Sequence, residues 1–279
     1  MNGRLFATAV FCTAVRLGLL AFIQKSMPVS AAKVDFARMS AFYDHFDDGS
    51  LDATKWMIDN RPANGTIQGH KGFFTRENID FSTGMLRLKL VQSPTADGIV
   101  SYGASIQSKE QFRYGRYEFV MRMASTSATP SSRGNDVSGS VSSAFIFVNN
   151  SETELDIEHL GDRPGLLHLS NWFNTEPSQH PSGGFEGFNR IRQYEQIPFR
   201  GAADDFRAYV IEWTPNRVKW YIDGQQVASH DTHVPEAPAY IKFNLWGTDR
   251  KEWGGIATVG IPRYMYIRSV SFRPMESKQ

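Results

Sequence analysis

The chain has 279 residues, of which 41% are hydrophobic and 21% charged, and its formal net charge is +1. This length and composition fit one globular domain of about 240 residues after an N-terminal extension. The near-neutral charge gives no electrostatic case for a nucleic-acid partner, and the single cysteine, Cys12, excludes an intramolecular disulfide.

The N-terminal segment has the parts of a secretory signal peptide. Arg4 stands near the start, residues 5–15 and 17–23 are largely apolar, and Ser30-Ala31-Ala32 offers small residues before a cleavage point. We therefore expect a signal peptide over residues 1–32, a single domain over 33–279, and a secreted or periplasmic protein. A membrane anchor or a misassigned start codon would also explain the segment. No later stretch approaches the ~20 apolar residues of a membrane span, so no stable membrane association is expected after processing.

The rest of the chain reads as successive short strands with few helical stretches. Period-two alternation or apolar runs mark strands near residues 79–81, 85–91, 105–108, 114–123, 141–148, 166–173, 206–213, 217–222, 226–230, 238–246 and 264–272. Turns at residues 96–98 and at Asp223-Gly224 separate neighbouring strands. This spacing predicts an all-β fold, a sandwich or jelly roll of two antiparallel sheets.

Two loops have compositions that suggest other roles. Asp47, Asp48 and Asp52 could bind Ca²⁺, but their surroundings have the composition of an ordinary turn. Residues 124–140 are small, polar and rich in serine, which predicts mobility rather than chemistry. Spaced zinc ligands such as HExxH are absent, and we expect no metal and no cofactor.

The stretch from Ser151 to Gly161 carries the strongest chemical signal. Glu154, Asp156 and Glu158 alternate with Leu155 and Ile157, so a strand here has three carboxylates on one face and an apolar opposite face. We expect the first and third carboxylates about 6–7 Å apart at their Cα atoms, and retaining glycoside hydrolysis uses two carboxyl groups roughly 5–5.5 Å apart. Because like charges resist joint ionisation, at least one should stay protonated at neutral pH. Taken alone, the pattern is more often a solvated acidic face.

Two neighbouring segments strengthen the catalytic interpretation. If residues 141–148 pair with the acidic strand as a hairpin, Phe145 or Phe147 lies beside the acids. Residues 166–173 alternate so that His168, Ser170 and Trp172 share one face, which suits a cleft floor with a stacking platform. A purely structural His168 is the alternative.

Several motifs, in order over roughly residues 40–274, resemble glycoside hydrolase family 16, which includes lichenases, laminarinases, agarases and xyloglucan transglycosylases. They are the acidic strand itself, Tyr114-Gly115-Arg116-Tyr117-Glu118, Val141-Ser142-Ser143-Ala144-Phe145, the pair Glu212-Trp213-Thr214-Pro215 and Lys219-Trp220-Tyr221-Ile222-Asp223-Gly224, and Asn244-Leu245-Trp246. The resemblance implies a concanavalin-like jelly roll whose concave sheet holds an open polysaccharide cleft.

The same resemblance implies residue roles. Glu154 corresponds to the nucleophile, Glu158 to the acid/base and Asp156 to the aspartate that supports the pair. Asn64, Phe145, Trp172, Asn244 and Trp246 match sugar-contact positions, and His168 joins them from its place on the predicted cleft floor.

Departures from the family pattern concern substrate choice. The five-residue ExDxE spacing resembles the lichenase and xyloglucan-enzyme branch, not the bulged strand of laminarinases. Glu152 and His159 stand where lichenases carry aromatic residues, and we expect pH behaviour or specificity to differ there. Tyr102 and Ala104 occupy the strand where lichenases have a sugar-binding Glu and Arg, and Arg268 aligns with an aspartate of their structural Ca²⁺ site.

The sequence thus predicts a secreted, monomeric, retaining endo-β-glycanase acting on a polysaccharide, with β-1,3-1,4- or β-1,3-glucan as the leading substrates. A transglycosylase or an exopolysaccharide depolymerase would use the same residues. A non-catalytic carbohydrate-binding jelly roll is the alternative from another class.

Overall fold

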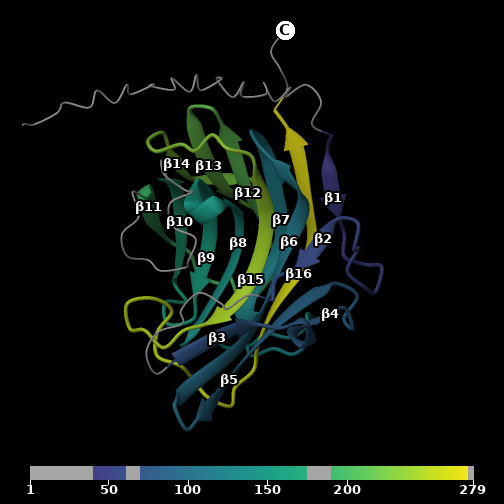
Figure 1. Ribbon diagram of the computed structural model, residues 1–279, viewed down its shortest axis with the longest axis vertical. Helices are drawn as coiled ribbons and strands as arrows, with labels where there is room; N and C mark the ends of the chain where they lie inside the picture. The colour runs from purple at the N-terminus through teal and green to yellow at the C-terminus, as the bar shows by residue number, and fades with distance from the viewer. Residues whose placement is uncertain (1–39, 61–69, 175–189, 276–279) are drawn as a thin grey trace, which may run out of the picture. The chain divides into compact units, whose positions relative to one another are not determined.

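The computed structural model describes residues 40–60, 70–174 and 190–275. Within these ranges the protein is built almost entirely from β-strands, and the described residues group as one compact unit. The expected signal peptide, residues 1–32, lies outside the described residues. The strands form two layers packed face to face, joined through β5 and β6 (Figure 1), which confirms the predicted jelly roll.

The first layer carries the acidic strand. Its hydrogen-bonded order is β11 (Arg190–Pro198), β10 (Leu166–Asn174), β9 (Thr153–Leu160), β8 (Ser140–Val148), β15 (Ala239–Gly247) and β6 (Gly98–Phe112). The short strand β2 (Trp56–Ile58) pairs with β6, as does β3 (His70–Phe74), which runs parallel to it. All the other strand pairings within the described residues are antiparallel.

The second layer covers the inner side of the first. Its order is β5 (Leu86–Thr95), β16 (Arg263–Pro274), β7 (Gly115–Ser125), β12 (Arg207–Thr214), β13 (Arg217–Ile222) and β14 (Gln225–His230). The short strands β1 (Phe42–Asp44) and β4 (Ile79–Asp80) pair with β16 and β5. Two single-turn 3₁₀ helices, η2 (Arg76–Asn78) and η3 (Asn149–Ser151), complete the described elements.

The core lies between the layers and follows from the alternation of the strands. Leu155 and Ile157 of β9 point inward and pack in one hydrophobic cluster with side chains such as Phe119, Ile211 and Trp220 from the second layer. Each such side chain contributes about 1.5–3 kcal/mol when fully buried. Burial of the apolar face leaves the carboxylates of β9 on the opposite side of the layer.

Turn chemistry places the predicted hairpins. Asp223 and Gly224 connect β13 to β14 with φ angles of 49° and 81°, the two positive values that a two-residue type I′ turn needs and that glycine adopts without strain. The β5–β6 hairpin closes across Ala96-Asp97, with Thr95 opposite Gly98. Both turns agree with the sequence prediction, although β5 and β6 are longer than expected.

The serine-rich loop between β7 and β8 is held to β7 by hydrogen bonds, contrary to the expected mobility. The buried Arg122 donates hydrogen bonds to the backbone carbonyls of Thr129, Pro130 and Ser132 at 3.0, 3.1 and 2.6 Å. A guanidinium offers five donors in a fixed fork and can therefore hold several carbonyls at once. Small polar composition did not reveal this anchor because Arg122 lies on the preceding strand.

Candidate active site

The three acidic side chains of β9 lie on the solvent-facing side of the first layer, here called the carboxylate face. Strand pairing places Phe147 and Trp172 opposite Glu154, and Phe145 and Ser170 opposite Asp156. Residues directly opposite in antiparallel strands share a face. The hairpin of β8 and β9 therefore brings both phenylalanines beside the acids, as the sequence predicted.

Asp156 is the most buried acid of the row, with 4% of its surface exposed. Its Oδ2 accepts hydrogen bonds from Ser170 Oγ at 2.5 Å and from Trp172 Nε1 at 3.1 Å. On the other side of the strand, Trp220 Nε1 donates to the backbone oxygen of Asp156 at 3.1 Å. The aspartate is thus fixed from both faces of the layer and is poised as a rigid acceptor between the two glutamates.

Glu154 is half-buried at the beginning of the strand. The hydroxyl of Ser151 donates a hydrogen bond to its Oε2. Ser151 ends the 3₁₀ turn η3 in a left-handed conformation, with φ of 66°. A donor to the carboxylate favours its charged form, which suits a nucleophile.

Glu158 has a different environment. Ser143 Oγ lies 3.4 Å from its Oε1, a long hydrogen bond. Burial and, secondarily, the negative charge of Glu154 raise the pKa of Glu158 to about 8, whereas Ser143 and Arg192 oppose the shift. A glutamic acid with this pKa is protonated at neutral pH and can donate a proton.

The expected Cα separation of the outer acids, Glu154 and Glu158, is wrong. Glu154 and Glu158 are four residues apart, so their Cα atoms lie about 13 Å apart at a rise of about 3.3 Å per residue, twice the separation of neighbouring acids in the row. Their long side chains must lean toward each other over Asp156 to flank one bond. Part of the rise in the pKa of Glu158 comes from the negative charge of Glu154.

The expected sugar-contact residues occupy different places. Strand pairing puts Phe145, His168, Trp172 and Asn244 on the carboxylate face. Trp246 is 5% exposed and packs in a small cluster with Phe74, Val141, Leu160 and Trp253, which leaves little ring surface for a sugar. Asn64 lies outside the described residues.

His168 is buried beside the acid/base candidate, opposite Glu158. Its Nδ1 lies 2.5 Å from Tyr194 Oη, and its Nε2 has no hydrogen-bond partner. Burial, followed by the charges of Arg163 and His159, lowers the pKa of His168 to about 4. The imidazole is therefore neutral at physiological pH, so it adds no cation beside Glu158.

Strand β11 supplies face residues that the sequence interpretation missed. Its register places Arg192 opposite Trp172 and Tyr194 opposite Ser170, and the guanidinium lies 4.6 and 4.7 Å from the ring centroids of Trp172 and Tyr194. The alternation of Arg192, Tyr194 and Gln196 with Ile191, Gln193, Glu195 and Ile197 was the available signal. The sequence interpretation also missed Asp59 and Lys242. Asp59 follows β2 and Lys242 lies on β15, and these distant segments come together only in the folded protein.

Glu152 and His159, where we expect pH behaviour or specificity to differ, have their own partners away from the acids. His159 is buried on the inner side of β9, with Nε2 3.1 Å from Asp136 Oδ1. Glu152 precedes the strand and accepts a hydrogen bond from Asn149 Nδ2 at 3.0 Å. Neither contact reaches the three acids.

The acidic turn that could have bound Ca²⁺ has structural partners. Asp52 Oδ1 accepts hydrogen bonds from the backbone N and the hydroxyl of Thr54 at 2.8 and 2.6 Å, and Lys55 Nζ lies 3.7 Å from Asp52 Oδ2. In the part of the chain that the structure describes, no group of three or more His, Cys, Asp or Glu side chains could hold a metal ion. Within the same ranges, no helix has the length and apolar character of a membrane span.

A jelly roll with a row of acids and aromatic rings on one open face defines a polysaccharide-processing class of protein, and comparison with known proteins gives its family. The sequence profile described as "Glycosyl hydrolases family 16" matches residues 67–261. The chain therefore belongs to glycosyl hydrolase family 16.

Individual relatives agree with this assignment. The chain is 31% identical over 179 residues to a beta-glucanase of Fibrobacter succinogenes, covering 60% of this chain and 45% of that protein. It is 25% identical over 248 residues to a beta-glucanase of Brevibacillus brevis, covering 86% and 84%. The chain thus spans less than half of the first relative and most of the second.

Solved structures extend the likeness to the fold. A prokaryotic beta-1,3-1,4-glucanase (lichenase) derived from a mouse hindgut metagenome superposes with a TM-score of 0.67 at 23% identity, covering 85% of this chain and all of that one. The beta-glucanase of Bacillus licheniformis gives a TM-score of 0.65 at 24% identity, covering 84% and 98%.

Proposed function

We propose that this protein is a retaining endo-β-glycanase that hydrolyses internal bonds of a β-1,3-1,4-glucan. The observation that carries the proposal is the pair Glu154 and Glu158 on one strand face, the first receiving a hydroxyl hydrogen bond and the second with its pKa raised to about 8. Two carboxyl groups whose environments separate their pKa values are the groups that a double displacement requires. The beta-glucanase relatives support the choice of substrate.

In the first step, a carboxylate oxygen of Glu154 attacks the anomeric carbon while Glu158 gives its proton to the departing glycosidic oxygen. The bond to the leaving chain breaks, and a glycosyl ester on Glu154 forms. In the second step, Glu158, now ionised, takes a proton from water, and that water displaces Glu154 at the same carbon. Asp156, held by Ser170 and Trp172, keeps the two glutamates in place.

We further propose that the protein is exported and acts on a mixed-linkage substrate. The signal-like segment of residues 1–32 favours export, so the substrate would be an extracellular or periplasmic polysaccharide. The enzyme would act as a monomer. The unbulged acidic strand favours mixed-linkage glucan over β-1,3-glucan.

The test is a reducing-sugar assay of the full chain on lichenan, laminarin, xyloglucan, agarose and carrageenan. We expect lichenan to be cleaved with the β-anomer formed first, seen by proton NMR, and Glu154→Gln or Glu158→Gln to lose at least about 10³-fold in kcat. Glu118→Gln, an exposed acid on β7 of the other layer, is the matched control and should keep full activity.

Three results would overturn the proposal in different ways. Near wild-type hydrolysis by either glutamine variant would remove the assigned residues. Longer products with a labelled acceptor oligosaccharide would identify a transglycosylase, and glucan binding without new reducing ends at any pH would identify a non-catalytic binding protein.

A further inference from the structure

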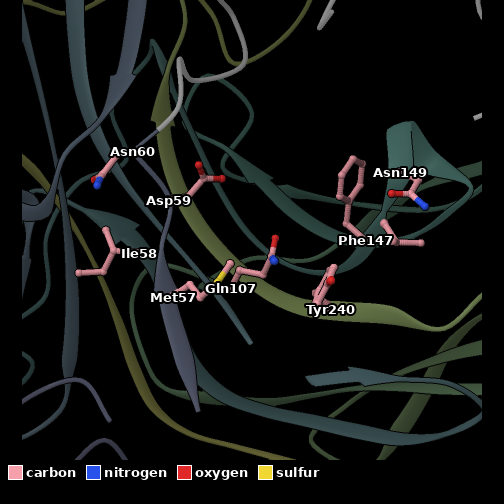
Figure 2. Close-up of a pocket in the computed structure, with 9 residues that line it drawn as sticks. Met57, Ile58, Asp59, Asn60, Gln107, Phe147, Asn149 and Tyr240 are labelled. Carbon is pink, nitrogen blue, oxygen red and sulfur yellow. The ribbon is translucent and has the colours of Figure 1, made fainter. Parts of the chain in front are cut away.

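A cavity of about 420 Å³ lies next to the row of acids. Figure 2 shows residues of β2 and the segment after it, Met57 to Asn60, on one side, and Phe147 with Asn149 on the other. Gln107 of β6 and Tyr240 of β15 lie between them. Its volume falls in the range of about 300–1,000 Å³ typical of ligand pockets. Among the residues that the structure describes, none of the sugar-contact positions expected from the sequence lines it.

The cavity is continuous with the carboxylate face through Phe147. That phenylalanine is opposite Glu154 on one side and opposite Tyr240 on the other, so the three side chains form one row across β9, β8 and β15. Strands in a sheet are about 4.7–4.9 Å apart. A polysaccharide that passes Glu154 and continues across β8 therefore reaches the cavity within about one or two sugar rings.

Asp59, which lines the cavity, forms a buried ion pair with Lys242 behind it. Asp59 Oδ2 lies 3.5 Å from Lys242 Nζ, and the two side chains are 8% and 6% exposed. The lysine ammonium also lies 5.6 and 5.3 Å from the ring centroids of Phe145 and Phe147. Lys242 thus links the cavity wall to the aromatic residues beside the acids.

Such a pair is poorly explained by packing alone. Removing two charges from water is costly, and apolar residues of similar volume usually stabilise a fold as well or better. An ionised carboxylate only accepts hydrogen bonds, which suits hydroxyl donors and gives bonds stronger than those between neutral groups. Because Lys242 balances its charge, the site carries no net charge to select an acidic sugar.

We propose that this cavity is a distal sugar subsite, in which Asp59 accepts hydrogen bonds from the hydroxyls of a neutral pyranose that stacks on Phe147 or Tyr240. Lys242 is a positioning residue that holds the carboxylate of Asp59. The inference rests on the proposed glycanase function and adds a determinant of substrate length and sugar type to it.

The experiment compares kcat/KM on β-glucan oligosaccharides of increasing length, using the full chain. We expect wild-type kcat/KM to rise when the substrate becomes long enough to fill the cavity. Asp59→Asn should reduce the ratio of kcat/KM on long to short substrates about tenfold, the effect of losing a hydrogen bond to a charged group. The loss should appear in KM rather than kcat.

Two further variants separate binding from packing. The apolar pair Asp59→Leu with Lys242→Met should fold with a melting temperature at or above that of the wild type, yet keep the low ratio. Asp80→Asn breaks an ion pair with Arg87 in the second layer, where the two groups are 2.7 Å apart, and should leave the ratio unchanged. A wild-type ratio in the apolar-pair protein would overturn the subsite.

Direct binding keeps this test apart from that of the proposed function. Isothermal titration of the full-length Glu154→Gln protein with a long neutral oligosaccharide, with and without Asp59→Asn, needs no turnover. Equal affinities would reject the subsite even if glucan is hydrolysed. Weaker binding on the Asp59 change would support the subsite even if hydrolysis of lichenan failed and the reaction assignment fell.

Discussion

Glu154 and Glu158 are the same amino acid on the same strand face, yet their surroundings differ. Glu154 receives the Ser151 hydroxyl, whereas Glu158 has only a 3.4 Å contact from Ser143 and is raised in pKa by burial and by Glu154. The difference arises from where the strand begins: Ser151 of the 3₁₀ turn bonds to the first acid, whereas the last acid has only the long contact from Ser143 of β8. One short segment thereby holds a carboxyl group that accepts a hydroxyl hydrogen bond and another whose pKa is raised to about 8.

This division predicts the alkaline side of the pH profile. Glu158 acts as an acid only while protonated, so kcat/KM should fall as pH rises through its folded pKa of about 8. The charge of Arg192 lowers that pKa. Arg192→Gln should therefore move the alkaline limb upward, by about a few tenths of a pH unit because an exposed cation is screened by water.

The measurement is kcat/KM against pH at fixed ionic strength. Arg192→Lys keeps the charge and should leave the limb near its wild-type position. Arg217→Gln removes a cation from β13, where Arg217 Nη2 is 3.6 Å from Asp231 and does not face the acids, and should have no effect. A downward shift in Arg192→Gln would contradict the assignment of the limb to Glu158.

At the scale of elements, local patterns predicted more than long-range ones did. Period-two alternation identified β9 and β10 and the face of each that carries polar side chains, and Asp223-Gly224 identified a hairpin. Partners across the sheet could not be read from the chain, because they depend on register. Asp59 and Lys242 are separated by 183 positions, and no local signal joins them.

The serine-rich loop is a second case in which a long-range contact could not be predicted from local sequence. Its composition predicts mobility, yet the loop is tied to β7 by the guanidinium of Arg122, which also lies 4.7 Å from the ring centroid of Tyr266. Composition describes what a loop can do alone. It does not register a buried donor on a neighbouring strand that satisfies the loop's carbonyls.

Arg122→Met should release this loop, because methionine fills similar space but donates no hydrogen bond. We expect a loss of about 2–4 kcal/mol in the free energy of unfolding, since three carbonyls lose a charged donor. Trypsin should then cleave after Arg133, an exposed site within the loop, much faster than in the wild type. Arg116→Met on the same strand is half-exposed and serves as the control. Equal cleavage rates in the Arg122 and Arg116 variants would show that the anchor is not needed.

At the scale of the two-layer fold, the second layer supports the acids from beneath. The indole of Trp220 on β13 crosses the core and donates to the backbone oxygen of Asp156. Sequence motifs placed Trp220 in a family hairpin and Asp156 in the acidic strand, but not in contact. Strand patterns thus predict the fold class. The hydrogen bond between the two layers, from Trp220 to Asp156, can be seen only in the folded structure.

Trp220→Phe tests this link. The substitution removes the donor to Asp156 and leaves a small cavity, so unfolding free energy should fall by about 1–3 kcal/mol. Trp213→Phe is a closely matched control. Trp213 is also buried in the second layer, and its Nε1 donates a hydrogen bond of 3.1 Å to the backbone oxygen of Pro235.

Both variants should show similar losses of melting temperature. Only Trp220→Phe should also lower kcat on polysaccharide, by about threefold to tenfold, since small displacements of reacting groups are costly. Equal kcat in the two variants, measured well below their melting temperatures, would mean that Trp220 stabilises the core without positioning the acids.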